Sequence, residues 1–137
     1  MVQPEDLLAH AIRLLESADS DLDYRVVVER AYYSAYHAAR ELEERLPQRS
    51  GVTTDKMGSH EGLLLRLERP HPKLDYGLSI LSKDIGAQLR QLKPLREIAS
   101  YELDETVRVD QAEDAIEAAK DVLVECRKGM RKVGARN

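Results

Sequence analysis

Apolar residues recur at every third or fourth position along almost the whole chain, and this spacing constrains the fold more than any other feature. Such a period places one apolar stripe along a helix, whereas a half-buried strand requires a period of two. The only run of β-branched residues, Val26 to Val28, lies inside a longer helical pattern. The 137 residues include six tyrosines but no phenylalanine or tryptophan, so the core must consist of Leu, Ala, Val and Ile. The sequence predicts an all-α, up-and-down bundle of about five helices.

Prolines and capping signals set the expected helix boundaries. The expected ranges are about 4–17, 21–46, 59–69, 74–103 and 110 onward. Ser59 should begin the third helix as its N-cap, because a serine hydroxyl can accept a free backbone N–H. Pro94 lies inside the fourth range and should kink that helix or divide it in two. Asp110, with Glu113 three residues later, is typical of a capping box at the start of the fifth helix.

The length of the chain predicts one domain, which we assign to residues 1–126. The remaining segment, residues 127–137, carries five basic residues and no acidic one, although the whole chain has a formal net charge of −4. We interpret this segment as a basic C-terminal tail. Cations near the end of a helix stabilise it, so the tail does not by itself predict contact with nucleic acid.

Several classes of function are excluded or disfavoured by composition. Cys126 is the only cysteine, which excludes an intrachain disulfide and a cysteine-rich zinc site. The four histidines lack the spacing of a zinc-binding HExxH helix, and no glycine-rich loop could hold a phosphate, so we expect no metal and no cofactor. The longest apolar stretch is far shorter than the roughly 18 residues of a membrane span. We therefore expect a cytoplasmic protein with no membrane partner.

The second expected helix has two different faces when its side chains are projected at about 100° per residue. One face contains small apolar residues that suit a bundle core, namely Val27, Val28, Ala31, Ala35, Ala38, Ala39, Leu42 and Leu46. The opposite face contains Val26, Arg30, Tyr33 and His37, flanked by Tyr36 and Arg40. Two interpretations stay open for this second face. Its tyrosines could bury their rings against another helix, or its Arg and His side chains could converge on an anionic ligand.

Three motifs in this chain resemble those of small bacterial and archaeal HEPN-domain proteins, where HEPN stands for higher eukaryote and prokaryote nucleotide-binding. They are the run Arg30-Ala-Tyr-Tyr-Ser-Ala-Tyr-His-Ala-Ala-Arg40, the segment Ser59-His60-Glu61-Gly62, and Arg96-Glu-Ile-Ala-Ser-Tyr101. The resemblance covers about residues 5 to 125. It implies a helical bundle that is commonly dimeric and often encoded beside a minimal nucleotidyltransferase in toxin–antitoxin pairs.

The resemblance also implies a possible ribonuclease, because many HEPN proteins cleave RNA without metal through an Arg followed four to six residues later by a His. In those proteins the pair lies on the later helix, which corresponds to Arg96, and Tyr101 stands where the His would be needed. Tyrosine, with a reference pKa near 10, is a poor base at neutral pH. We therefore expect little or no catalysis. Arg30 and His37 match the bare spacing on the earlier helix and stay candidates for a catalytic pair.

A second candidate anion site lies at the start of the third helix, where Lys56 and His60 flank Ser59. A helix N-terminus carries free N–H groups and a partial positive charge that attract phosphates. The alternative is a plain N-cap with His60 on the surface.

Three functions follow from these residues. The first is a non-catalytic module that recognises a nucleotide or RNA through Arg30, Tyr33, His37, Arg96 and Tyr101, or that pairs with a nucleotidyltransferase. The second is an active metal-independent endoribonuclease. The third is a structural dimerisation domain, and we expect a homodimer because five helices that bury the alanine-rich face of the second cannot also cover its tyrosine face.

Overall fold

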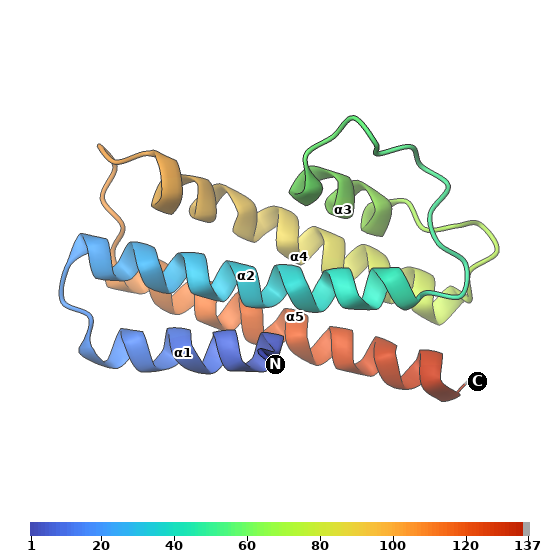
Figure 1. Ribbon diagram of the computed structural model, residues 1–137, viewed down its shortest axis with the longest axis horizontal. Helices are drawn as coiled ribbons and strands as arrows, with labels where there is room; N and C mark the ends of the chain where they lie inside the picture. The colour runs from blue at the N-terminus through green and yellow to red at the C-terminus, as the bar shows by residue number, and fades with distance from the viewer. Residues whose placement is uncertain (136–137) are drawn as a thin grey trace.

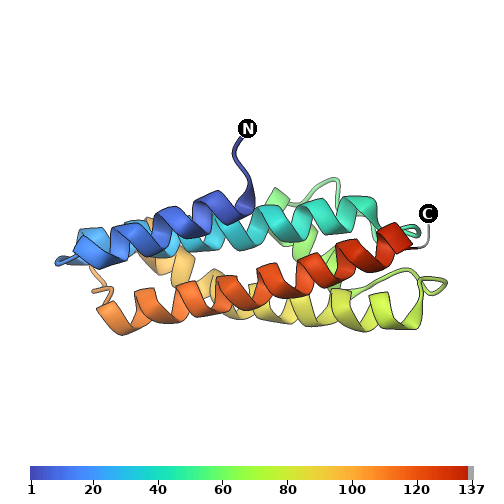
Figure 2. The ribbon, with the colours of Figure 1, turned by 90° about the horizontal axis from the view of Figure 1, so that it is seen from below.

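The computed structural model describes residues 1–135, which form five helices and no strand. The helices are α1 (Pro4–Ser17), α2 (Asp21–Arg45), α3 (Ser59–Glu68), α4 (Tyr76–Tyr101) and α5 (Val109–Ala135). The four long helices alternate in direction along the molecule (Figure 1 and Figure 2). The predicted all-α, up-and-down bundle is therefore confirmed. None of the helices within the described range is long and apolar enough to cross a membrane.

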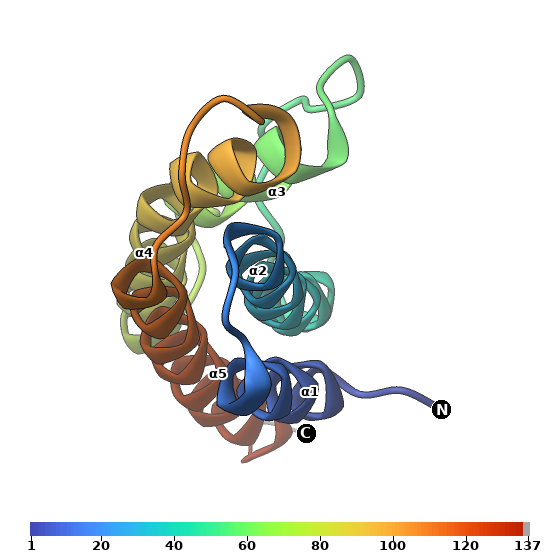
Figure 3. The same ribbon diagram turned by 90° about the vertical axis from the view of Figure 1, so that its left-hand side faces the viewer.

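Helix α2 lies at the centre of the bundle. It packs against α1, α4 and α5, which curve around it, while α3 packs mainly on α4 (Figure 3). All eight residues assigned to its core face are buried. Of the opposite face, Tyr36 is buried, Val26, Arg30, Tyr33 and His37 are half-buried, and Arg40 is exposed. That partial exposure is compatible with a dimer, which stays a prediction.

Two of the expected capping arrangements are wrong, although α3 begins at Ser59 as expected and α5 begins only one residue before the expected position. The N-cap of α3 is Gly58, whose carbonyl accepts the Gly62 N–H at 2.9 Å, and the exposed Ser59 is the first helical residue. Its hydroxyl therefore lies one position too late to cap. Helix α5 begins at Val109 rather than Asp110, because the side chain of Gln111 accepts the Arg108 N–H at 2.9 Å and replaces the expected capping box.

The later helices also differ from the expected pattern. Helix α4 spans 76–101 rather than 74–103 and continues through Pro94 as one helix. Pro94 is exposed, so the hydrogen bond that a proline removes is lost on the solvent side. Helix α5 continues to Ala135 through most of the segment expected to be a tail, because Gly129 and Val133 extend its buried face. Residues 136 and 137 lie outside the described residues.

Arg25 joins the first turn of α2 to the last turn of α4. Its buried guanidinium donates to the backbone carbonyls of Ile98 at 2.9 Å and Ala99 at 3.2 Å. It also donates to the carbonyls of Glu102 and Glu105 in the following loop. The last four carbonyls of a helix have no partner within it, and Arg25 donates to two of them, so it acts as a C-terminal cap of α4.

Asp21 completes this clamp from the same turn of α2. Its carboxylate accepts from Arg25 Nε at 3.1 Å and from the Val107 backbone N–H at 2.7 Å. The hydrogen bond from the Val107 N–H, followed by the one from Arg25, keeps the pKa of Asp21 below its usual value even though partial desolvation opposes this. The loop between α4 and α5 is thereby held against α2.

Glu43 forms a second clamp near the other end of α2. This buried carboxylate accepts from Arg49 Nη2 and Arg66 Nε, both at 2.7 Å, and Arg66 also donates to Thr54. Burial alone would raise the pKa of Glu43, but the hydrogen bonds from the two arginines bring it below its usual value. The clamp fixes α3 and the loop before it to α2.

Helix α3 approaches α4 at Gly86 and Ser82. A Cβ on Gly86 would lie 3.2 Å from Leu67 Cβ, and the Ser82 hydroxyl donates to the Leu67 carbonyl at 2.8 Å. Ion pairs from Arg90 to Glu61 and Glu68, at 2.9 and 2.7 Å, add to this contact. The residues at the start of α3 are thereby placed over α2 and α4.

We expect Arg25→Met to lower the free energy of unfolding by about 3 kcal/mol, because the carbonyls of Ala99 and Glu105 lose their donor, whereas those of Ile98 and Glu102 keep a backbone N–H. Urea unfolding followed by circular dichroism measures this. Arg108→Met, which removes an exposed arginine paired with the exposed Asp110, should change stability little. Equal losses in the two variants would contradict the role assigned to Arg25.

Candidate functional site

Five rings gather where α2, α3 and α4 meet, and we call them the aromatic cluster. Its members are Tyr32, Tyr33, Tyr36 and His37 of α2 and His60 of α3. The Tyr36 and His60 ring centroids are 4.3 Å apart, and the Tyr33 and His37 rings are stacked at 6.1 Å. The four α2 residues can meet because positions three and four apart share one side of a helix.

His60 enters the cluster from the first turn of α3. Its Nδ1 atom lies 3.0 Å from the Tyr32 hydroxyl, so these two groups share a hydrogen bond. Burial raises the pKa of Tyr32 to about 12, which keeps its hydroxyl protonated. His60 is thus oriented by a neutral partner rather than by a carboxylate. The expectation that His60 belongs to a separate site with Ser59 and Lys56 is not supported by this placement.

Arg96 reaches the cluster from α4. Its guanidinium lies over the rings of Tyr32, Tyr33 and Tyr101, at 5.6, 5.8 and 5.2 Å from their centroids, and donates to the Tyr33 hydroxyl at 3.2 Å. Its Nε atom is buried without a hydrogen-bond partner. Within residues 1–135, no carboxylate forms an ion pair with Arg96. Contact with aromatic faces supplies the attraction that a carboxylate would otherwise give.

The electrostatics of the cluster favour neutral histidines. Burial, followed by the charges of Arg96, Lys93 and His37, lowers the pKa of His60. Burial, followed by the charge of Arg40, lowers the pKa of His37. Arg40 lies 5.7 Å from the Tyr36 ring centroid. At least one cation therefore acts on each histidine, and an anion bound near them would raise both pKa values.

The structure brings together Tyr33, His37, His60, Arg96 and Tyr101 from the predicted site residues. Arg30 is half-buried with an unpartnered Nε, but it is not among the contacts that join the cluster. Lys56 and Ser59 are exposed and also lie outside those contacts. The sequence predicted that Arg30 and His37 of α2 would face Arg96 and Tyr101 of α4. In the structure it is Tyr33 of α2, and not Arg30, that contacts Arg96.

Sequence reasoning missed the role of Tyr32. The projection of α2 assigned it to neither face, yet its buried ring stacks on Tyr36 and its hydroxyl orients His60. The four-residue spacing between Tyr32 and Tyr36 could have revealed this role, because it places both residues on one side of the helix, between the two faces assigned from the sequence. That side is the one covered by α3.

Comparison with protein-family models, with curated proteins and with solved structures gave no match. No group of three or more His, Cys, Asp or Glu side chains within residues 1–135 is placed to hold a metal ion. The function must therefore be argued from the cluster itself.

The lowered pKa values of His37 and His60 predict a pH dependence of stability. At pH values between these lowered pKa values and the ordinary histidine pKa of 6.5, the unfolded chain binds more protons than the folded one. The free energy of unfolding should therefore be greatest above pH 6.5 and decrease as pH falls below it. Glu43 and Glu61, whose pKa values lie below 4.5, contribute only at lower pH.

Urea unfolding at about pH 7.5 and about pH 5.5 measures this difference. We expect His60→Asn to reduce the difference in the free energy of unfolding between the two pH values. Asparagine can keep the hydrogen bond to Tyr32 but does not titrate. His10→Asn, outside the cluster, should leave the difference intact. An unchanged pH dependence in His60→Asn would show that the cluster histidine is not its source.

Proposed function

We propose that this protein is a HEPN-like binding module that recognises a nucleotide or RNA through Arg96 and the aromatic cluster, without cleaving it. The observation that carries the proposal is an arginine held by tyrosine rings and a tyrosine hydroxyl, with two histidines nearby and no paired carboxylate among residues 1–135. Arginine offers a planar fork of donors to a phosphate. Tyrosine and histidine rings offer faces on which a base can stack.

The charge balance around Arg96 supports an anionic ligand. An arginine that serves only the fold is usually paired, as Arg25, Arg66 and Arg90 are in this chain. Among the described residues, the contacts of the Arg96 side chain are with neutral groups, which leaves its charge free to attract an anion. The neighbouring acid Glu97 pairs with Lys93 at 3.5 Å. An anion bound at Arg96 would therefore meet no competing carboxylate on that side chain.

Tyr101 extends this site toward solvent. The residue is 68% exposed, although the Arg96 guanidinium lies over its ring at 5.2 Å from the centroid. An exposed aromatic ring beside an arginine is the arrangement expected of a stacking surface for a base. The resemblance to HEPN proteins points to the same class of ligand and also suggests a nucleotidyltransferase as a protein partner.

We expect Arg96→Ala to weaken binding of a fluorescent single-stranded RNA by about tenfold or more, the usual effect of losing charged hydrogen bonds. Fluorescence anisotropy titration measures it. Arg30→Ala should weaken binding less, because Arg30 lies outside the cluster contacts. Arg13→Ala removes the same charge from an exposed position on α1 and is the matched control. Unchanged affinity in a folded Arg96→Ala variant would exclude the site.

Ribonuclease activity is the second candidate function, and one observation favours it. His37 and His60 both contact the Tyr33 ring, over which Arg96 also lies. Either histidine could therefore supply the general base that Tyr101 does not. A histidine could take the proton of a 2′-hydroxyl while arginine neutralises the phosphate. Within the described part of the chain, however, neither histidine has a carboxylate partner that would raise its pKa.

We therefore expect little or no cleavage of RNA by the purified protein in excess chelator, measured on a labelled oligonucleotide by gel electrophoresis. Losing a general base typically lowers rates by about 10² to 10⁴. Cleavage that disappears in His37→Ala or His60→Ala, with the fold retained, would establish the catalytic alternative instead. Cleavage that persists in both variants would indicate a contaminating nuclease.

A further inference from the structure

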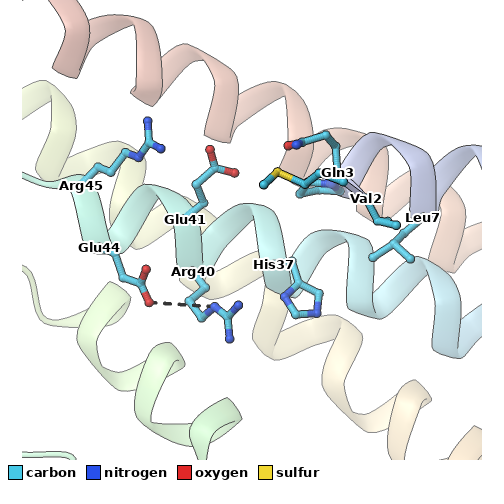
Figure 4. A pocket seen from close by; sticks show the side chains of 10 residues that line it. Val2, Gln3, Leu7, His37, Arg40, Glu41, Glu44 and Arg45 are labelled. Atoms are coloured by element: carbon cyan, nitrogen blue, oxygen red, sulfur yellow. Dashed lines mark ion pairs between the residues drawn. The ribbon is translucent and has the colours of Figure 1, made fainter.

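A hollow of about 670 Å³ lies between the N-terminal segment and the second half of α2 (Figure 4). Val2 and Leu7 form its apolar wall, while His37, Arg40, Glu44 and Arg45 line the α2 side. Its volume falls within the usual range of small-molecule sites, about 300–1,000 Å³. The α2 residues that line the hollow are half-buried or exposed.

The hollow adjoins the aromatic cluster directly, because His37 belongs to both and Arg40 contacts a ring of the cluster. His37 lines the hollow while its ring centroid lies 5.2 Å from that of Tyr36. Arg40 lines the hollow while its guanidinium lies over the Tyr36 ring. A ligand held at the cluster could therefore extend into the hollow without crossing another element.

The charges of the hollow do not suit a second phosphate. Arg40 and Arg45 are balanced by Glu41 and Glu44, and the nearest contact between Arg40 and Glu44 is a loose 4.0 Å. Glu41 is also drawn to Arg127, at 3.7 Å. Charged side chains of both signs, beside apolar ones, suit a flat group with polar edges. A nucleobase has these properties.

We propose that this hollow is a base-binding subsite, which receives the nucleobase of a nucleotide whose phosphate is held at Arg96. The proposal rests on the proposed function. Tyr33, which contacts Arg96, precedes His37 and Arg40 by four and seven residues, or about 6 and 10 Å along a helix. His37 then stacks on the base or its sugar, and Glu44 and Arg45 face the polar edge.

Leu7 offers a direct way to close the hollow. It is half-buried and lines the hollow, but it is not among the partly buried residues that pack on the hydrophobic core. Leu7→Trp should therefore fill the space with little effect on the fold. Leu22→Trp, at a position 69% exposed near the start of α2, adds the same ring outside the hollow and is the matched control.

The experiment compares adenosine 5′-monophosphate with ribose 5-phosphate, which carries the same phosphate and sugar but no base. Isothermal titration calorimetry measures both affinities. We expect the nucleotide to bind at least about tenfold more tightly, as the stacking of one base typically gives. Leu7→Trp should abolish that advantage and leave ribose 5-phosphate unchanged, while Leu22→Trp retains it. Arg96→Ala should weaken both ligands.

The outcomes separate the two proposals. Equal affinity for the two ligands, or an advantage that survives Leu7→Trp, would overturn the subsite and leave phosphate recognition at Arg96 intact. Binding of neither ligand would overturn both the subsite and mononucleotide recognition by the cluster. As a second probe, Glu44→Ala and Arg45→Ala should reduce affinity for the nucleotide only. A loss of ribose 5-phosphate binding in these variants would also contradict the subsite.

Discussion

The hydrogen bonds from Arg25 to the end of α4 are the interaction on which the arrangement of the site depends. A helix ends with carbonyls that have no partner within it, and burying them requires donors from elsewhere. Arg25 supplies those donors from α2, so the end of α4 is fixed in register against the start of α2. This register sets Arg96 opposite Tyr33, two turns further along α2. A slip of either helix would separate them.

The Glu43 clamp fixes the position of α3 against α2, as Arg25 fixes the position of α4. A buried carboxylate is costly unless several donors satisfy it, and here Arg49 and Arg66 do so from two different segments. The consequence is that His60, at the start of α3, is carried to Tyr32 and Tyr36. The polar residues of this bundle thus position its helices, whereas the leucine and alanine core, which is less directional, supplies the burial.

The sequence was sufficient to predict the helices and the buried face of α2, because both follow from a local period. It also predicted that Arg30, Tyr33, His37, Arg96 and Tyr101 share one site, since antiparallel helices in a bundle bring such positions near each other. Arg96 contacts α2 through Tyr33, however, and Arg30 lies outside those contacts. It could not show that His60 belongs with them, because this depends on the Glu43 clamp and on the close approach of α3 at Gly86. The N-cap of α3 was missed for a local reason. Glycine and serine are both suitable N-cap residues, and in the structure the N-cap is Gly58 rather than Ser59.

The contrast between Arg96 and the other buried arginines explains why the cluster is suited to binding. Arg25 and Arg66 have their charges balanced within the fold, so an external anion would have to displace an internal partner. Arg96 is balanced only by ring faces, which attract a cation without occupying all of its donors. An anion could therefore bind there while the ring contacts persist. The two histidines would then gain protons as their surroundings became less positive, so ligand binding and proton uptake at the cluster should be linked.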